Sequence, residues 1–372
     1  MLVIDADAHG EENEATFGDP YLDPAFRAQR PRQVALDDNA YWVIEDQLFP
    51  RRVGRGAHNL GSPTTVGGER TWFTATKPET LPSIELSSPE ARLRDMDAEG
   101  IDVAVVYPGL FLVHPLTNNP RLGTALCAAY NRWMAEKLGR HERLRWAAAV
   151  NLDDVPGAVR LVREARRLGA VAVMILGTVG DRLLDDPALL PFYEAVAAEE
   201  LALAVHVGWS CPSISNLYSD LYVGTVIPFL MPVAMGFAGL VAGGVLDRLP
   251  ELRVGFLEAG CEWVHYMVHR LDHRYIFAEL MAKRWPEQAP RAASRPLEYI
   301  RRGNLYFATE VEDTLLPQVI ELCGEGQIVF GSDMLHGDRE PFAAKILRER
   351  SDLSESSKQK IFEANPRRLY RL

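Results

Sequence analysis

The sequence has no excess of basic residues: 40 Lys and Arg stand against 51 Asp and Glu, which gives a net charge of −11. We therefore expect no nucleic acid and no anionic membrane as partner, since both are bound through basic surfaces. The four cysteines show no Cys-x-x-Cys spacing, which argues against a zinc knuckle and is typical of reduced thiols in the cytoplasm. The N-terminal segment has no basic region followed by an apolar stretch, so we expect no signal peptide.

One apolar run, residues 224–246, is long enough to raise the question of a membrane span. It contains two prolines and several glycines, and it lies in the middle of a chain that alternates between strand-like and helix-like segments. We expect this run to form a buried helix together with its entry loop.

Short apolar runs alternate with helical segments from residue 88 to the C-terminus. With the first run of the chain they make eight candidate strands, seven of them followed directly by a helix. The expected strands are residues 2–9, 101–108, 143–152, 170–177, 201–208, 252–260, 304–310 and 327–333. Near-continuous apolar strands alternating with helices indicate a parallel sheet. Eight such units, none followed by a Gly-x-Gly-x-x-Gly turn, favour a closed barrel over a dinucleotide-binding sheet.

We therefore predict an α/β fold, a (β/α)8 TIM barrel that occupies residues 1–372 as one domain. Residues 10–88 are polar and rich in proline and glycine, and they contain a hairpin-like aromatic stretch at residues 41–52. This segment is too long for an ordinary loop, so we expect a lid-like insertion or a small subdomain over a site.

Polar side chains interrupt three of the apolar runs near their C-terminal ends. Asp7 and His9 lie two residues apart in the first run, so both point to one face of the strand. His206 ends the fifth run, and Asp333 ends the eighth. Because the C-terminal ends of barrel strands meet at one mouth, we expect these four side chains to bind one divalent metal ion.

The strand–helix series, with IDADAH at its start, HVG in the fifth run and GSD in the eighth, resembles the amidohydrolase superfamily. More narrowly, YLDPAFR, ARLRDMDAEGIDVAVVYP, LRVGFLEAG and FGSD resemble the branch of aminocarboxymuconate-semialdehyde decarboxylase and the resorcylate decarboxylases. The resemblance implies a metal bound by Asp7, His9, His206 and Asp333. Asp7 stands where the superfamily usually has His, which tilts the preference from zinc toward manganese. The fourth run has no bridging Lys, so we expect a single metal.

By the same resemblance, Glu258 occupies the position where the branch usually has a His that orients or deprotonates the metal-bound water. A carboxylate there serves as a general base if a dry pocket raises its pKa. The alternative is that Glu258 pairs with a structural partner such as Arg253 or His265. Asp333 is a second candidate for proton transfer.

Other candidates surround the predicted mouth. His336, with Asp338 beside it, follows the expected ligand Asp333 and is a candidate for catalysis or for support of that ligand. Tyr107, Trp209 and Glu310 are expected to bind substrate, with the alternative that the aromatic residues only pack. The insertion offers Arg51, Arg52 and Arg55 as anion-binding groups. The helical stripe of His265, His269 and His273 is interpreted as a surface or interface stripe.

The resemblance predicts a metal-dependent lyase that decarboxylates a small aromatic or unsaturated carboxylic acid. The alternative is a hydrolase that cleaves an amide, lactone or carbon–carbon bond with metal-bound water. A non-catalytic binding barrel is the third class. We expect a cytoplasmic homodimer or larger homo-oligomer.

Overall fold

The computed structural model describes residues 1–36, 39–51, 54–56, 63, 65–66, 69–70, 79–334, 336 and 339–372. Eight parallel strands form one sheet, and consecutive strands of the sheet are neighbours in it. They are β1 (Ile4–Gly10), β7 (Val103–Pro108), β8 (Leu144–Ala149), β9 (Ala172–Leu176), β10 (Ala202–His206), β11 (Val254–Leu257), β12 (Leu305–Thr309) and β13 (Ile328–Phe330). All eight predicted strands are therefore confirmed.

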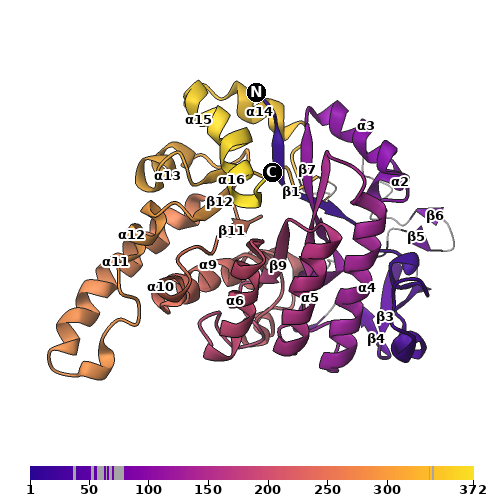
Figure 1. The fold of residues 1–372 in the computed structure, drawn as a ribbon, viewed down its shortest axis with the longest axis horizontal. Helices are drawn as coiled ribbons and strands as arrows, with labels where there is room; N and C mark the ends of the chain where they lie inside the picture. Colours follow the sequence, from indigo (N-terminus) through magenta and orange to yellow (C-terminus); the bar gives the residue numbers. More distant parts are fainter. Residues whose placement is uncertain are drawn as a thin grey trace.

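The sheet closes on itself through the segment after β13. The Asp333 amide donates to the Asp7 carbonyl at 2.9 Å, and the His9 amide donates to the Met334 carbonyl at 3.0 Å. The first and last strands thus meet, and the predicted (β/α)8 barrel is confirmed (Figure 1). This closure also brings Asp7 and Asp333 side by side, although 326 positions separate them in the sequence.

Helices cover the outside of the barrel (Figure 1). The longer ones are α3 (Pro89–Glu99), α4 (Pro120–Leu138), α5 (Val155–Leu168), α6 (Leu190–Ala198), α9 (Ile227–Ala242), α11 (Glu262–Ala282), α12 (Pro296–Arg301), α13 (Leu316–Cys323), α14 (Ala343–Glu349), α15 (Glu355–Gln359) and α16 (Asn365–Tyr370). Four single-turn helices are α2 (Leu81–Ile84), α7 (Pro212–Ser215), α8 (Leu221–Gly224) and α10 (Val245–Arg248).

Local sequence sets the ends of several of these helices. The Ser88 side chain accepts from the Ala91 amide and begins α3, and Gly100, at a φ of 75°, ends it. Asp154 and Gly169 do the same for α5, with Gly169 at a φ of 96°. A left-handed residue after a helix is adopted most easily by glycine, so both stops follow from the sequence.

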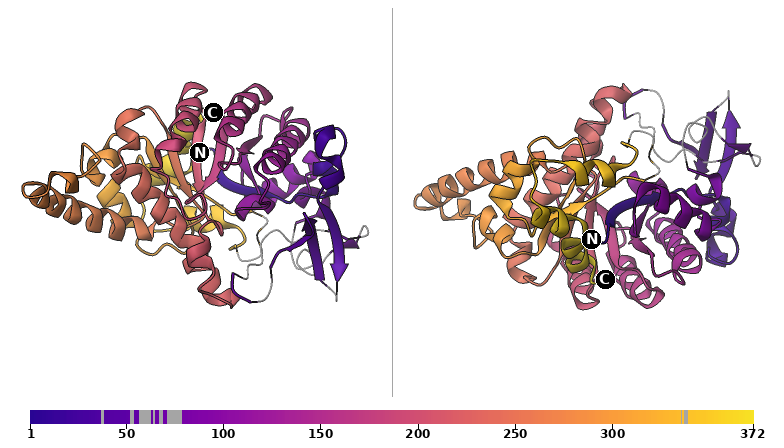
Figure 2. Two further views of the ribbon diagram at one scale, coloured as in Figure 1. Left: turned by 90° about the horizontal axis from the view of Figure 1, so that it is seen from below. Right: turned by 90° about the horizontal axis from the view of Figure 1, so that it is seen from above.

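The segment between β1 and α3 forms a small sheet of its own beside the barrel (Figure 2). Strands β2 (Arg32–Leu36), β3 (Asn39–Ile44) and β4 (Gln47–Phe49) are antiparallel, and β5 (Thr65–Val66) pairs with β6 (Glu69–Arg70). The predicted aromatic hairpin corresponds to β3 and β4. Trp42 of this sheet is buried and packs edge-on against Phe17, with ring centroids 5.7 Å apart.

The long apolar run forms α8, α9 and α10 rather than one helix. The stretch Leu221–Ala242 is long and apolar enough to cross a membrane by length and composition, with a mean hydropathy of 1.9, and 56% of its most apolar window is buried inside the protein. Core helices meet the same criterion. The buried positions of α9 face β9, β10 and β11, where they form part of the barrel's covering layer.

Candidate metal centre

Six polar side chains converge inside the C-terminal mouth of the barrel. They are Asp7 and His9 of β1, His206 at the end of β10, Glu258 just after β11, and Asp333 and His336 after β13. Parallel strands end at one rim, so residues far apart in the chain meet there. Asp7, His9 and His206 are wholly buried, whereas the side chains of Glu258 and Asp333 retain 11% and 16% exposure toward the mouth.

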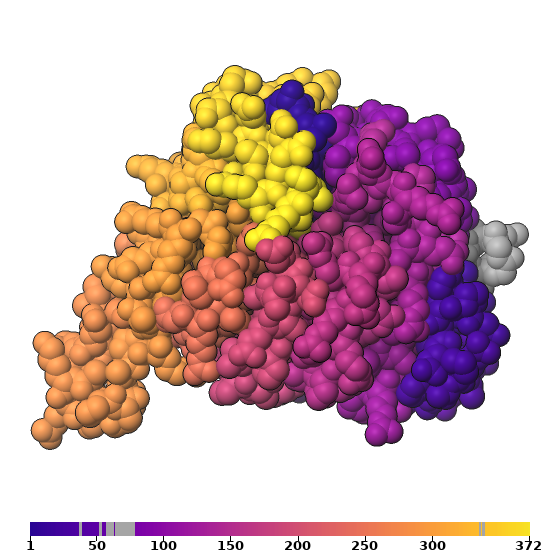
Figure 3. Space-filling view, in the orientation of Figure 1, coloured from indigo at the N-terminus to yellow at the C-terminus, as the bar shows by residue number. Residues whose placement is uncertain are grey.

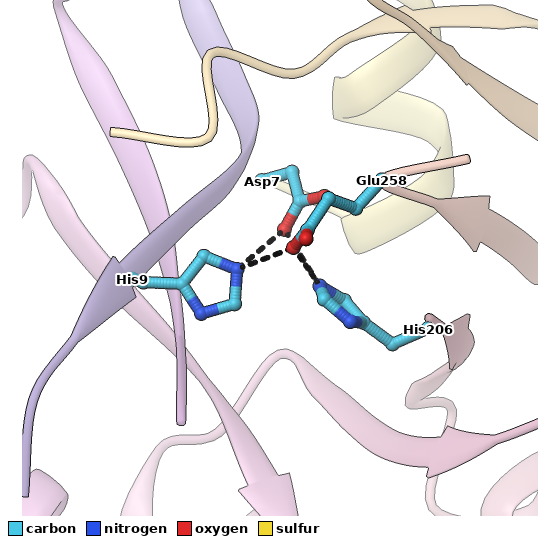
Figure 4. A group of neighbouring side chains, drawn as sticks. All are labelled: Asp7, His9, His206 and Glu258. Carbon is cyan, nitrogen blue, oxygen red and sulfur yellow. Dashed lines mark hydrogen bonds and ion pairs between the residues drawn. The ribbon is translucent and has the colours of Figure 1, made fainter. Parts of the chain in front are cut away.

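Asp7, His9, His206 and Glu258 form one compact set of ligand atoms (Figure 4). Nε2 of His9 lies 3.1 Å from Glu258 Oε2 and 3.6 Å from Asp7 Oδ1. Nε2 of His206 lies 3.3 Å and 3.2 Å from the same two oxygens. Neighbouring ligands of a divalent ion bound at about 2.1 Å are separated by about 3–3.5 Å, so this set has the spacing of a coordination shell.

The other nitrogen of each imidazole fixes the ring. Nδ1 of His9 lies 3.2 Å from the Pro108 carbonyl, and Nδ1 of His206 lies 3.1 Å from the Val207 carbonyl. A carbonyl only accepts, so both Nδ1 atoms carry a proton, and both Nε2 atoms face carboxylate oxygens. Each Nε2 needs positive charge between it and these oxygens, which a proton supplies in the metal-free site and a divalent cation supplies in the loaded one.

The pKa directions agree with this requirement. Burial opposes ionisation of Asp7, but attraction to His206 and hydrogen bonds from His206 and His9 hold the pKa of Asp7 below its ordinary value. Burial alone would lower the pKa of His9, yet hydrogen bonds with Asp7 and Glu258 raise it. Protons on the imidazoles therefore compete with a metal ion for the same place, and metal binding releases them.

Asp333, the fourth predicted ligand, lies beside this group, in a second group that shares His9 and Glu258 with it and adds His336. Its Oδ1 lies 3.6 Å from Nε2 of His9 and 2.6 Å from Nδ1 of His336, so its role as a metal ligand stays a prediction. Glu258 takes the fourth place in the first group. The alternative that Glu258 pairs with Arg253 is wrong, because the Arg253 guanidinium donates to the carbonyls of Leu369 and Glu200.

Backbone conformation explains how Glu258 and Asp333 reach inward. Both residues have left-handed backbones, with φ of 55° and 51°. Few residues other than glycine adopt this conformation, and it costs about 1–3 kcal/mol at functional sites that retain it. These two conformations are not evident from the sequence. By the resemblance, Glu258 was therefore expected at the position of the base and not among the metal ligands.

A pocket of about 280 Å³ opens onto Glu258, Asp333 and His336. Trp209, Phe229 and Leu230 form an apolar wall, and Glu310 and Arg339 line the polar side. The Trp209 indole packs against Phe229 with ring centroids 4.5 Å apart and donates to the Gly224 carbonyl at 3.0 Å. The Arg339 guanidinium is bound by Glu79 and Glu99.

Glu310 is a carboxyl group on this pocket with a raised pKa. Burial, together with repulsion from Asp313, Glu258 and Asp333, raises the pKa of Glu310 to about 8. The Gly260 amide donates to its Oε1 at 3.3 Å. The raised pKa favours the protonated form of Glu310 on the wall of the pocket.

The remaining candidates are distributed differently. The Tyr107 hydroxyl hydrogen-bonds to Tyr370 of α16 at 2.8 Å, and its buried ring lies beside the two histidines, with centroids 6.2 Å from His9 and 5.5 Å from His206. Arg51 lines a separate pocket near β4, and Arg55 is exposed. Arg52 and Asp338 lie outside the described residues. The three histidines of α11 are exposed, as expected of a surface stripe.

A family model described as Amidohydrolase matches residues 83–372, more than three quarters of the chain. The chain belongs to this amidohydrolase family. The match begins at α2 and includes seven of the eight barrel strands, but it leaves out β1 and the small sheet. The ligands on β1, Asp7 and His9, thus rest on the geometry above and not on the family match.

Several known proteins are similar to this amidohydrolase. The 2-amino-3-carboxymuconate-6-semialdehyde decarboxylase of Dictyostelium discoideum is 22% identical over 284 residues, which cover 74% of this chain and 75% of that protein. The crystal structure of an amidohydrolase from Mycobacterium avium subsp. paratuberculosis superposes with a TM-score of 0.78 at 22% identity, covering 99% and 97% of the two chains. The manganese complex of 5-carboxyvanillate decarboxylase from Novosphingobium aromaticivorans gives a TM-score of 0.71 at 19% identity, covering 100% and 96%.

Proposed function

We propose that this amidohydrolase is a metal-dependent carboxy-lyase that removes CO₂, without oxidation, from a small aromatic or unsaturated carboxylic acid. The observation that carries the proposal is the position of Glu310, a buried carboxyl group on the wall of the pocket that opens onto the metal centre, where burial raises its pKa to about 8. Decarboxylation of this kind needs an acid that protonates carbon, whereas hydrolysis needs a base that activates water. The decarboxylase activity named for the Dictyostelium relative supports the same choice.

Asp7, His9, His206 and Glu258 would hold the metal ion. Two imidazoles and two carboxylates suit Mn²⁺ or Zn²⁺, and the acidic share of the set favours manganese. The bound ion would supply positive charge for the substrate's carboxylate and a neighbouring oxygen. The chain's own contribution is to hold the ring nitrogens in the right tautomer through the Pro108 and Val207 carbonyls.

Glu310 would deliver its proton to the carbon that bears the carboxylate. The carbon–carbon bond then breaks, its electron pair returns to the ring or double bond, and CO₂ leaves. Trp209, Phe229 and Leu230 form the apolar wall against which a flat substrate would stack. Glu258, first expected as a general base, would here bind the metal, and Asp333, expected as a ligand and as a second candidate for proton transfer, lies beside it on the wall of the pocket.

The test is CO₂ release from a panel of hydroxybenzoic and unsaturated carboxylic acids by protein loaded with Mn²⁺. We expect stoichiometric CO₂ and the matching decarboxylated product from at least one member. A protein that retains its metal yet yields only hydrolysis products from amide and lactone panels would overturn the proposal in favour of the hydrolase.

The role of Glu310 has its own variant. Glu310→Gln keeps the side chain's size and hydrogen bonding but cannot give up a proton, so we expect turnover to fall about 10²–10⁴-fold with unchanged metal content. Glu321→Gln, the same substitution on the exposed face of α13, is the matched control and should retain full activity. Full activity in Glu310→Gln would exclude Glu310 as the acid.

We also propose that the protein works in the cytoplasm as a homodimer or larger homo-oligomer, and that the segment between β1 and α3 acts as a lid. Four buried cysteines without disulfides support the compartment, since reducing conditions keep such thiols free. The position of the small sheet supports the proposal of a lid. Strands β3 and β4 of this sheet line a pocket together with residues 113–118 and Trp209 of the mouth.

A further inference from the structure

We infer that the substrate of this pocket is a carboxylic acid that also carries a basic amine, and that Glu312 and Glu340 at the rim bind this amine as an ammonium ion. The inference rests on the proposed function, because it takes the substrate's carboxylate to lie at the metal centre. It goes further by naming a second charged group of the substrate and the side chains that select it.

The charge on the wall of the pocket is one-sided. Carboxyl groups line it at five described positions, which are Glu258, Glu310, Glu312, Asp333 and Glu340. In the described part of the wall the guanidinium belongs to Arg339, and it is already bound by Glu79 and Glu99. One divalent ion offsets only two negative charges, so a substrate that brings a carboxylate and no positive group would enter a negative field. A positive group on the substrate removes this repulsion.

The carboxyl groups lie at two depths. Glu258 and Asp333 lie at the metal centre, with side chains 11% and 16% exposed, whereas Glu312 and Glu340 are exposed residues of the same pocket. Glu312 follows β12 and Glu340 precedes α14, so both belong to the segments that leave the last two barrel strands at the mouth. A substrate whose carboxylate lies at the metal therefore extends its far end toward Glu312 and Glu340.

The two rim carboxylates are not used elsewhere in the fold. Neither Glu312 nor Glu340 makes a hydrogen bond or an ion pair with any residue that the structure describes. The four neighbouring charges that act most strongly on Glu310 are all carboxylates, Glu312 among them. Carboxylates gathered around one pocket repel one another, and an ammonium ion placed between them relieves that repulsion.

The apolar wall of the pocket suits the same group. Trp209 and Phe229 line it, and aromatic faces attract organic ammonium ions. At about 280 Å³ the pocket is small for a ligand site, which fits one ring or a short unsaturated chain with two substituents. The amine must be basic enough to be protonated at neutral pH, as an aminomethyl group is.

The experiment is isothermal titration calorimetry of the full chain loaded with Mn²⁺. It compares three benzoates that differ only in the para substituent, which is aminomethyl, hydroxymethyl or methyl. We expect the aminomethyl acid to bind about tenfold more tightly than the other two, as an ammonium ion held by carboxylates and aromatic faces should. Because Glu312 and Glu340 are exposed, this advantage should shrink as salt is added.

Glu312→Gln combined with Glu340→Gln removes both charges at nearly constant size and should bind the three acids equally. The matched control, Glu142→Gln combined with Glu321→Gln, removes two charges at exposed positions outside the pocket and should keep the full preference. For an amine-bearing acid that the protein decarboxylates, the rim variant should raise KM more than it lowers kcat, because the contact lies far from the bond that breaks.

The possible results separate this inference from the proposed function. Equal binding of the three acids by the unaltered protein overturns the amine, and CO₂ release, which is measured on its own, still decides the reaction. A preference for the amine that persists in the rim variant overturns the assignment to Glu312 and Glu340. A preference that the rim variant loses, in a protein that releases CO₂ from no acid, supports the ammonium site and overturns the carboxy-lyase.

Discussion

Glu12 shows how a single buried carboxyl can set the pH dependence of stability. Its side chain is buried three residues after the ligand His9, and its Oε2 accepts from the amides of Gly109 and Leu110, while Oε1 has no hydrogen-bond partner among the described residues. Burial and repulsion from Glu11 raise the pKa of Glu12 from an ordinary 4.5 to about 8. Between pH 4.5 and about 8, Glu12 therefore releases its proton in the unfolded chain but keeps it in the folded protein.

We therefore expect stability to fall as pH rises from about 4.5 to about 8, and this component to vanish in Glu12→Gln. Each pH unit across which only the unfolded state ionises changes the free energy of unfolding by about 1.4 kcal/mol. Urea unfolding at pH 5 and pH 8 should show the gap between variant and parent widening by up to about 4 kcal/mol. The exposed Glu142→Gln serves as control; equal pH slopes in all three proteins would refute the assignment.

Glu310 makes a different prediction, about activity and not about stability. The proposed reaction needs its protonated form, so turnover should fall as pH rises through the pKa of Glu310. That limb should lie at about 8 or lower, because a bound metal ion offsets the negative charge of Glu258, one of the groups that raise this pKa. The measurement is kcat between pH 6 and 9 with saturating metal. An increase in kcat above pH 8 would show that a base, not an acid, limits the reaction.

Among the structural elements, β9 and α9 depend on one close contact between backbones. Gly177, directly after β9, lies so near the Pro232 carbonyl of α9 that a Cβ atom there would overlap it. A backbone neighbour cannot move aside as a side chain does, so Gly177→Ala should lower the free energy of unfolding by at least about 1–3 kcal/mol. In Gly326→Ala the nearest atom is the end of the flexible Arg368 side chain, at 2.9 Å. Chemical denaturation of both variants checks this, and equal losses would contradict it.

The elements were predictable from sequence, whereas the ligand grouping was not. Apolar runs that end in His206 or Asp333 indicate strands that reach one rim of the barrel. The length of each apolar run predicts the strand, and the polar residue at its end marks the rim. Which carboxylate completes the shell of Asp7 and His9 depends on the left-handed backbones of Glu258 and Asp333 and on the closure of β1 against β13. These are products of tertiary packing, so residue type did not reveal them.

The same limit explains Tyr107. A tyrosine at the end of a strand can point to the mouth or to the interior of the barrel. Tyr107 lies in register with His9 of β1, and its hydroxyl hydrogen-bonds to Tyr370 of the C-terminal helix in the interior. The partner comes from the far end of the chain, and no local pattern connects the two. Glu310, by contrast, directly follows the barrel strand β12, and this position alone predicts that it faces the pocket at the mouth.

At the scale of the whole molecule, α11 extends away from the barrel (Figure 3). Several of its apolar side chains are exposed to solvent. Tyr266, Ile276, Phe277 and Leu280 of this helix are 47–66% exposed, and Trp285 follows it at 46%. Apolar side chains gathered on one projecting helix are typical of a surface that another protein covers. The other long apolar stretch, residues 224–246, packs in part against the barrel through α9 and is less suited to this role.

We therefore expect the proposed homo-oligomer to be held together by α11. Phe277→Glu combined with Leu280→Glu places two charges on the exposed face and should shift the chain to a monomer, because burying unpaired carboxylates costs several kcal/mol. Sedimentation equilibrium of variant and parent measures the shift, and Leu217→Glu, at another exposed apolar position, is the control. Because the described metal ligands all come from one chain, Mn²⁺ content should be equal in monomer and oligomer. A parent protein that is already monomeric would refute the oligomer, and a doubly substituted protein that stays associated would place the interface elsewhere.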